Sequence, residues 1–287
     1  MIVDKIFQTK ISELIYSIPK FEKRYTRESL GNTGWIDPLE KGFAYLGKVI
    51  LYEHIFRYVM VARDILEILH TLRKEIKILD VGCGTGYGSK ILYFLLNNNF
   101  CRKNKVEYVG IDIDEKAISE ALKKYLINNA NFSQSFKVAN VYELSEKFEK
   151  RSFDVIIFFG VVEHLDKPMS ALSEIKKLLK VNGRLYISTP NRLYPPRMIY
   201  NKLLGASLLS NPTHVFEYSW QEFLRFVKEL KGFEIIKVYG QNILPPKVRD
   251  FILKLLPTRF HYSIIMGLGR MLPWFSRDFI AVLKLKG

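Results

Sequence analysis

Residues 77–89 read KILDVGCGTGYGS, and this stretch decides the fold of the chain. Ile78, Leu79 and Val81 are apolar and suit a short buried strand. Glycines then occupy every second position from 82 to 88. Glycine lets the backbone adopt positive φ and lets a ligand come close to the main chain. We therefore predict a strand, a ligand-binding turn, and a helix over residues 87–96 whose N-terminal amides point at the turn.

Three kinds of glycine-rich loop compete for this turn. The dinucleotide pattern G-x-G-x-x-G fails because Tyr87 stands where its third glycine belongs, and the P-loop pattern fails because Lys90 follows a serine. The pattern D-x-G-x-G-x-G fits from Asp80 to Gly86 without a gap. A carboxylate at the mouth of the turn would repel a pyrophosphate. It suits a ligand that carries an ammonium and a sulfonium.

A second acid follows at the expected distance. Residues 106–112, VEYVGID, predict the next strand, with Asp112 at its C-terminal end. A carboxylate at this place can accept hydrogen bonds from both hydroxyls of a ribose, as in dinucleotide-binding folds. The order of strand, glycine turn, helix, strand and acid thus indicates a nucleoside-containing ligand.

In these residues the chain resembles the class I S-adenosylmethionine-dependent methyltransferases. The resemblance implies an α/β fold: a doubly wound, mostly parallel seven-stranded sheet with helices on both faces, Rossmann-like, whose last strand is antiparallel and lies at the edge. It also implies S-adenosyl-L-methionine as the cofactor. The cofactor-binding residues implied are Asp80, Gly82, Cys83, Gly84, Gly86, Asp112, Ile113, Asn140, Val141 and Gly160.

Three of the implied contacts have open alternatives. The family usually has an acid at Asn140, whose side-chain oxygen can still accept from the adenine amino group; a turn asparagine is the other interpretation. Arg57 or Tyr58, on the helix expected over residues 47–72, would reach the methionine carboxylate of the cofactor. Alternatively, both residues pack on the sheet or face solvent.

The rest of the chain alternates strands and helices, as a parallel sheet requires. Residues 1–72 form an N-terminal helical extension, and residues 73–287 form the methyltransferase core, with insertions at 191–218 and 240–276. Further helices are expected over 115–126, 168–179 and 219–230, and further strands over 136–139, 153–159, 184–189, 233–239 and 277–286. The insertion at 240–276 is apolar and basic and predicts two short helices. They would cover the pocket, form a dimer contact or lie on a membrane surface, and we favour the first.

The segment after the fourth strand, residues 160–165, reads GVVEHL. It resembles the family's segment that often ends in Glu-His. Quinone-pathway members also have an acid at the position of Gly160 and hold a metal there; because that acid is absent, we predict no metal. His164 is a candidate general base, and His214 in the first insertion is a second one. For each, a local hydrogen bond is the competing role.

Composition limits which partners, cross-links and cellular compartment we expect for the protein. The formal net charge is +15, but basic residues are scattered through the chain, which favours a solvated surface over a polyanion partner. Two distant cysteines, Cys83 and Cys101, predict neither a disulfide framework nor a zinc finger, and they favour the cytoplasm. No signal peptide or membrane-spanning segment is expected from the pattern of charges.

The predicted function is transfer of a methyl group from S-adenosylmethionine to an oxygen, or a nitrogen, of a small-molecule, sugar or lipid-linked acceptor. Two alternatives stand beside it. A nucleic-acid methyltransferase is disfavoured, because residues 160–163 lack the Asn/Asp-Pro-Pro-Tyr type of motif that holds a flipped base. A non-catalytic binding module would keep the same glycine turn. Peripheral membrane contact is expected, if anywhere, through residues 241–276.

Overall fold

The structure is a computed structural model that describes residues 7, 9–14, 52–70, 75–97, 104–127, 129–204 and 213–287. The domain boundary predicted at residue 72, most of the N-terminal extension and Cys101 lie outside the described residues. The chain divides into two compact units. The first comprises Met1–Lys77, Cys83–Val138 and Pro246–Tyr262, and the second comprises Ile78–Gly82, Ala139–Pro245 and Ser263–Gly287.

Seven strands form one mixed sheet in the order β3-β2-β1-β4-β5-β7-β6. Their bounds are β1 Glu75–Val81, β2 Lys105–Asp112, β3 Phe132–Val138, β4 Phe153–Phe159, β5 Leu179–Pro190, β6 Phe233–Gln241 and β7 Asp278–Leu285. The pairs β1/β4, β2/β3 and β4/β5 are parallel, whereas β7 is antiparallel to both β5 and β6. All seven residues of β4 are buried, as its uninterrupted apolar sequence predicts. The predicted fold class is confirmed.

The position predicted for the last strand is wrong. β7 lies between β5 and β6, and β6 forms the edge of the sheet. The burial of the two strands gives the reason. Residues 279–283 of β7 are all buried, while residues 234–237 of β6 are exposed, so the more continuously apolar strand takes the inner position.

Two strands, β3 and β5, begin four and five residues before the starts that the sequence predicts. β5 begins at Leu179, which pairs with Phe153, so Asn182 and Gly183 lie within the strand and do not end the preceding helix. Asn182 has φ of 64°, an irregularity that lets the strand continue through a turn-like sequence. β3 begins at Phe132 because it pairs with Val106 at the start of β2.

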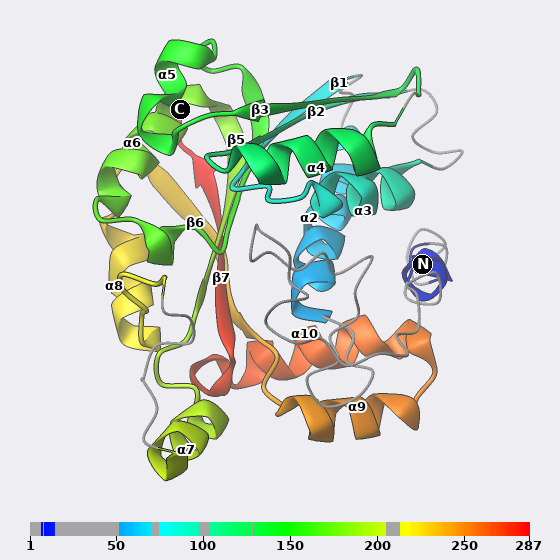
Figure 1. Cartoon of the computed structure of the whole chain (residues 1–287), viewed down its shortest axis with the longest axis vertical. Coiled ribbons are helices and arrows are strands. Elements are labelled where there is room, and N and C mark those ends of the chain that lie inside the picture. The colour runs from blue at the N-terminus through cyan, green and yellow to red at the C-terminus, as the bar shows by residue number, and fades with distance from the viewer. Residues whose placement is uncertain are drawn as a thin grey trace. The chain divides into compact units, whose positions relative to one another are not determined.

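In the first unit, α2 (Tyr52–His70) packs on α3 (Tyr87–Leu96), and α4 (Glu115–Tyr125) follows β2 (Figure 1). The Asp114 carboxylate caps α4 by accepting from the backbone N–H groups of Lys116 and Ala117. Residues 9–14 are helical, and the Lys10 ammonium donates to the carbonyls of Phe94 and Asn97 at the C-terminal end of α3. A cation at this end is favourable for the helix dipole. The unit also contains α9 (Pro246–Lys254) and η5 (Thr258–Phe260).

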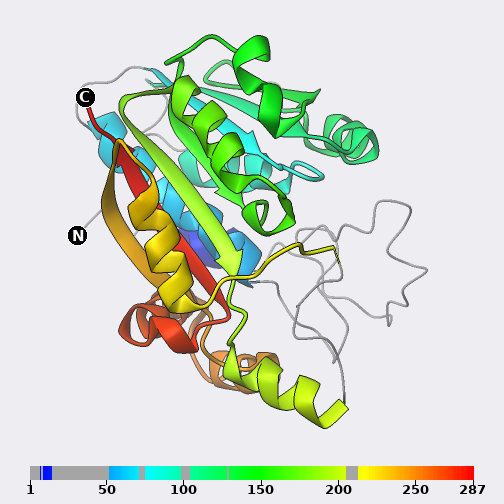
Figure 2. The same cartoon turned by 90° about the vertical axis from the view of Figure 1, so that its left-hand side faces the viewer.

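In the second unit, α6 (Pro168–Leu178) and α8 (Trp220–Glu229) lie side by side over one face of the strands β5, β7 and β6 (Figure 2). α10 spans His261–Met271, and its residues from 263 on belong to this unit. They pack on the opposite face of these strands, where Gly269 touches the backbone of Gly240. The remaining elements are η3 Val141–Glu143, α5 Leu144–Lys147, η4 Val162–His164, α7 Pro195–Leu204 and η6 Pro273–Phe275. The two helices predicted for the second insertion are thus present, as α9 and α10.

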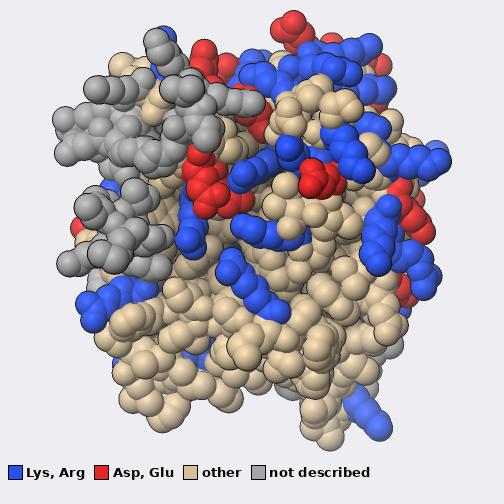
Figure 3. Space-filling model, turned by 180° about the vertical axis from the view of Figure 1, so that it is seen from behind, with Lys and Arg blue, Asp and Glu red and all other residues tan. Residues whose placement is uncertain are grey.

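In Figure 3, lysines and arginines gather over the upper part and the sides of the visible face, with acidic side chains among them, while the lower half is largely uncharged. Within the described part of the chain, every helix is too short or too polar to cross a lipid bilayer.

Candidate active site

The glycine turn between β1 and α3 depends on glycine for different reasons at different positions. Gly82, Gly84 and Gly86 have φ of +75°, +52° and +82°, in the left-handed region. A Cβ on Gly82 would lie 2.3 Å from Val161, and one on Gly86 would lie 2.8 Å from Phe136. A Cβ on Gly84 would meet nothing within 4 Å. Packing therefore explains two of the glycines, whereas Gly84 borders open space in which a ligand can approach the backbone.

Asp112 lies at the end of β2, as predicted, and it is joined to the turn. Its Oδ2 accepts a hydrogen bond from the Gly84 N–H at 2.9 Å, and its Oδ1 accepts from the Asp114 N–H at 3.0 Å. The Cys83 N–H also donates to the carbonyl of Ile111 at 2.9 Å. A carboxylate oxygen has two lone pairs, so Asp112 can accept further hydrogen bonds from a ribose. Ile113, the next residue, is 71% exposed and offers an apolar surface beside the acid.

The two candidates on α2 have different surroundings. The Tyr58 ring packs over Gly88, where a Cβ would lie 2.2 Å from the ring, and it contacts Tyr87 edge to face. Arg57 is buried and donates to His54 Nδ1 at 2.9 Å, and this nitrogen also lies 3.3 Å from the Tyr87 hydroxyl. Tyr58 thus packs on the first turn of α3, and its contact with the methionine carboxylate stays a prediction. The Arg57 guanidinium and the hydroxyl of Tyr87, the first residue of α3, thus share His54 Nδ1 as a neighbour.

The other predicted cofactor residues belong to the second unit. Asp80 is buried at the end of β1. The Asn140 side-chain oxygen accepts from the Tyr142 N–H at 3.1 Å and so caps η3, which begins at Val141. This is the turn role named as the alternative for Asn140, and its amide NH₂ is not used in that bond. Gly160 has φ of +67° and ends β4, where its N–H donates to the Ser188 carbonyl.

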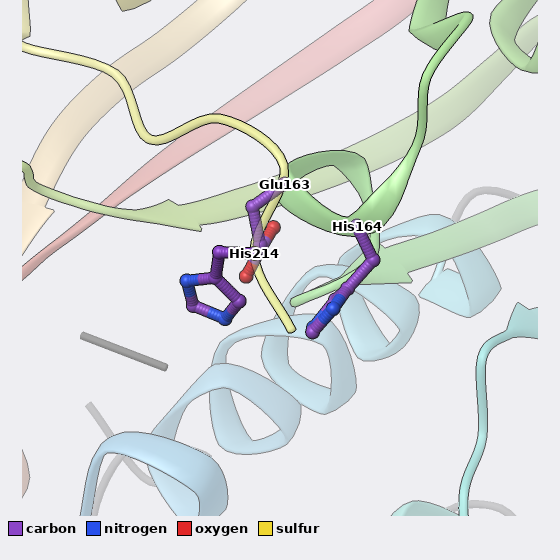
Figure 4. Close-up of side chains that lie close together, drawn as sticks. All are labelled: Glu163, His164 and His214. Carbon is purple, nitrogen blue, oxygen red and sulfur yellow. The ribbon is translucent and has the colours of Figure 1, made fainter. Parts of the chain in front are cut away.

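Both predicted histidines meet in one cluster, which we call the Glu163 cluster: Glu163, His164 and His214 (Figure 4). One donor atom from each side chain lies within 4.8 Å of those of the other two. The imidazole centroids are 4.6 Å apart at an interplanar angle of 84°. Glu163 is buried, and the two rings are half-buried.

Backbone hydrogen bonds bring the three residues together. The carbonyl of Glu163 accepts from the N–H groups of Val215 and Phe216 at 2.8 and 3.2 Å. His164 Nδ1 lies 3.1 Å from the Thr213 carbonyl and 3.2 Å from the Thr213 hydroxyl. It donates to the carbonyl in one tautomer and accepts from the hydroxyl in the other. The segment around His214 is therefore fastened to the η4 turn.

His214 is held by a buried carboxylate that the sequence analysis did not single out. Its Nδ1 donates to Glu217 Oε1 at 2.6 Å, and the other oxygen of Glu217 accepts from Arg197 at 2.7 Å. Glu217 is fully buried, and Arg197 neutralises its charge. The sequence signal was the spacing His-x-x-Glu from His214 to Glu217, which is too common to select these residues.

The tyrosine beside this carboxylate is not poised to ionise. Burial, followed by the negative charges of Glu163 and Glu222, raises the pKa of Tyr218 to about 12. Tyr218 is therefore a neutral hydrogen-bonding group at physiological pH. The insertion residues Asn191 and Arg192 have structural partners: Asn191 donates to the carbonyls of Trp274 and Ser276, and Arg192 forms a two-pronged pair with Glu222.

The chain matches a family described as "Methyltransferase domain" over residues 72–229. It is 30% identical over 177 residues to a ubiquinone biosynthesis O-methyltransferase of Pelagibacter ubique, covering 62% of this chain and 65% of that protein. It is 31% identical over 149 residues to the protein of that name from Alkalilimnicola ehrlichii, covering 52% and 55%. The chain thus spans between about half and two thirds of the length of these curated relatives.

Solved structures show the same fold. The magnesium protoporphyrin IX methyltransferase of Synechocystis PCC 6803 superposes with a TM-score of 0.53 at 16% identity, over 91% of this chain and 98% of that one. The plantazolicin methyltransferase BamL gives a TM-score of 0.53 at 17% identity, over 99% of both chains. At such identities the likeness concerns the fold alone.

Proposed function

Because the chain belongs to the methyltransferase-domain family, we propose that it transfers a methyl group from S-adenosylmethionine to an oxygen of a small-molecule acceptor. One observation carries this proposal. The Asp112 carboxylate holds the Gly84 N–H at 2.9 Å, and Gly84 borders open space. A nucleoside can therefore approach the turn while its ribose hydroxyls donate to Asp112.

Other residues of the first unit suit the remaining parts of the donor. The Arg57 guanidinium, which shares His54 Nδ1 as a neighbour with the Tyr87 hydroxyl, suits the methionine carboxylate, because a guanidinium donates charge-assisted hydrogen bonds. Ile113 suits the flat face of the adenine. The roles of Asp80, Gly82, Cys83, Asn140, Val141 and Gly160 stay predictions from the family resemblance.

Methyl transfer is an in-line displacement at the methyl carbon. The acceptor oxygen forms a bond to this carbon, the carbon–sulfur bond breaks, and the electron pair stays on sulfur, which becomes a neutral thioether. Holding acceptor and methyl group in line can lower the barrier by about 7–11 kcal/mol. A hydroxyl acceptor must also lose its proton, and assisting this step contributes about 10²–10⁴-fold.

We place the acceptor oxygen at the Glu163 cluster. The cluster follows the carboxyl end of β4, the edge of an open α/β sheet at which ligands bind. Val161, two residues before Glu163, packs against Gly82 of the glycine turn in the same unit. The relatives from Pelagibacter and Alkalilimnicola are named O-methyltransferases, which supports oxygen over nitrogen.

We also propose that α9 contacts a lipid surface, where the protein would meet a lipid-linked acceptor. Val248, Phe251 and Leu255 follow one another at helical spacing along α9 and just beyond its end, and they are 47%, 64% and 70% exposed. Lys254 in α9 and Arg259 in η5 are also exposed. Apolar side chains flanked by cations suit the interface of an anionic bilayer. Co-sedimentation with phosphatidylglycerol vesicles should fall for Phe251→Ser and stay unchanged for Leu122→Ser, an exposed apolar residue of α4.

The proposal is tested in two steps. Calorimetric titration with S-adenosylhomocysteine should show one site in the wild-type protein. Methyl-labelled S-adenosylmethionine is then incubated with the protein and fractionated cell extract, and the label should enter the small-molecule or lipid fraction. Label in nucleic acid would overturn the proposed acceptor class, and donor binding without any transfer would indicate the non-catalytic module.

A further inference from the structure

We propose that Glu163, His164 and His214 form a binding site for a divalent cation of the zinc type. The site is proposed to hold the acceptor oxygen as well, and this second part rests on the proposed function. From the sequence we expected no metal, because the acid that quinone-pathway members have at the position of Gly160 is absent. The structure brings a third donor, His214, from a different segment of the chain.

The donor set fits such a cation. Two imidazoles and one carboxylate are ligands that Zn²⁺ uses in sites with three protein ligands, where the fourth position stays open for water or substrate. With metal–ligand bonds of about 2.0–2.2 Å, donor atoms around a tetrahedral ion lie roughly 3.4 Å apart. The three donor atoms of the cluster lie within 4.8 Å of one another. Side-chain adjustments of about 1.4 Å therefore suffice to close the site around an ion.

The partners of the two rings also fit metal binding. His214 Nδ1 donates to the Glu217 carboxylate, and His164 Nδ1 lies within hydrogen-bond distance of the Thr213 carbonyl and hydroxyl. The proton on His214 Nδ1 leaves the lone pair of that ring on Nε2. The His164 tautomer that donates to the carbonyl presents Nε2 in the same way, so a metal ion would take the two Nε2 atoms. Metal-binding histidines commonly have such a carboxylate or carbonyl partner, which orients the ring and makes it a better ligand.

Further contacts hold this arrangement in place before an ion arrives. Glu217 is fully buried and is bound on its other oxygen by Arg197. Backbone bonds from Val215 and Phe216 fasten the His214 segment to Glu163. The carboxylate of Glu163 and both rings face a common space in Figure 4. A positively charged ion there would offset the buried negative charge of Glu163.

A cation at this place would assist the loss of the proton from the acceptor hydroxyl, a step in which the methyl donor takes no part. A hydroxyl bound at the open position loses its proton more readily, because the cation stabilises the oxyanion. The proton passes to solvent, and the oxyanion is the nucleophile of the displacement. Under this inference the two histidines act as ligands and not as general bases.

The experiment uses untagged full-length protein that has been treated with a chelator. Zn²⁺ is titrated in competition with a chromogenic chelator. We expect one equivalent bound by the wild type, and an affinity at least about 100-fold lower for His214→Ala and for the isosteric Glu163→Gln. Glu217→Gln, which removes the charge that pairs with both His214 and Arg197 but keeps all three donor residues, should weaken binding about 10–100-fold. The matched control is His261→Asn. In the wild type the His261 imidazole bonds the carbonyls of Leu253 and Leu256 in the first unit. This variant should bind Zn²⁺ with the wild-type affinity.

The outcomes separate the two proposals. No Zn²⁺ bound by the wild type, or equal affinity in His214→Ala, overturns the metal site. S-adenosylhomocysteine binding is measured on the same samples: donor binding without Zn²⁺ binding overturns only this inference, while Zn²⁺ binding without donor binding overturns only the proposed function. Thermal melts show that each variant is folded, and His164→Asn replaces any variant that is not.

Discussion

The backbone N–H of Gly84 donates a hydrogen bond to the Asp112 carboxylate at 2.9 Å. This bond fastens the glycine turn to the end of β2. The same carboxylate accepts from Asp114 and still has lone pairs for a ribose. Asp112 therefore shapes the turn and is also placed to bind the ligand, so a substitution there should affect both.

Asp112→Ala should weaken the binding of S-adenosylhomocysteine by about 1.5–3 kcal/mol, or roughly 10–150-fold, since hydrogen bonds to a charged group are lost. Calorimetry measures this change. Glu107→Ala is the control, because Glu107 lies on the same strand and pairs with Lys77 at 3.0 Å on the exposed surface. Unchanged affinity in Asp112→Ala would mean that the ribose is held elsewhere.

Gly84→Ala should mainly impair donor binding, whereas Gly86→Ala should mainly lower the stability of the fold. An alanine at position 84 meets no atom within 4 Å, so the fold should lose only about 1–2 kcal/mol from the left-handed backbone, while the approach of the donor is obstructed. An alanine at position 86 would clash with Phe136 and Ala121 and should destabilise the fold more. Urea denaturation and donor titration of both variants distinguish the two effects. Equal loss of stability in the two would contradict the distinction.

Ser219→Ala should lower the free energy of unfolding by about 1 kcal/mol. Ser219 and Glu222 form a capping box at the start of α8, in which each side chain binds the backbone N–H of the other residue. Urea denaturation measures the loss. Ser219→Asp keeps a capping acceptor and should retain most of the stability; a variant as unstable as the alanine would show that the cap is unimportant.

Glu174 should contribute stability that depends on pH. Burial raises the pKa of this carboxyl, but hydrogen bonds from Lys177 and Ser145 outweigh burial and lower the pKa from 4.5 to about 2. Because the folded pKa is the lower one, the contribution is present above pH 4.5 and is lost as the pH falls toward 2. The difference in unfolding free energy between wild type and Glu174→Gln should therefore be largest near pH 7 and shrink below pH 4.5. A difference that does not change with pH would point to packing instead.

Local chemistry made much of the fold predictable. The glycines before Tyr87, the buried run of Phe153–Phe159 and the cap at Ser219 each specify an element through nearby residues, and all three appear where expected. Asp112 was also predictable, because a strand-end acid after a glycine turn needs no knowledge of distant contacts. The position of β7 was not predictable in this way, since it depends on which of two apolar strands pairs with β5.

The Glu163 cluster could not be predicted from the sequence, because it too depends on contacts between residues that are distant along the chain. His164 and His214 could each be named as candidates, but only the hydrogen bonds from Val215 and Phe216 to Glu163 bring them together. Glu217 was not distinguished, because its importance comes from complete burial and from Arg197, neither of which the sequence displays. Arg57 and Tyr58, adjacent in sequence, have surroundings that the sequence does not display: Tyr58 packs closely on Gly88, and Arg57 bonds to His54.

The central claim is that the glycine turn and Asp112 hold a methyl donor. A crystal structure of the protein with S-adenosylhomocysteine tests it most directly. We predict that the compound lies along the backbone of Gly84 and that its ribose hydroxyls donate to the Asp112 carboxylate. The compound bound at any other place, with Gly84 and Asp112 facing solvent, would contradict the claim.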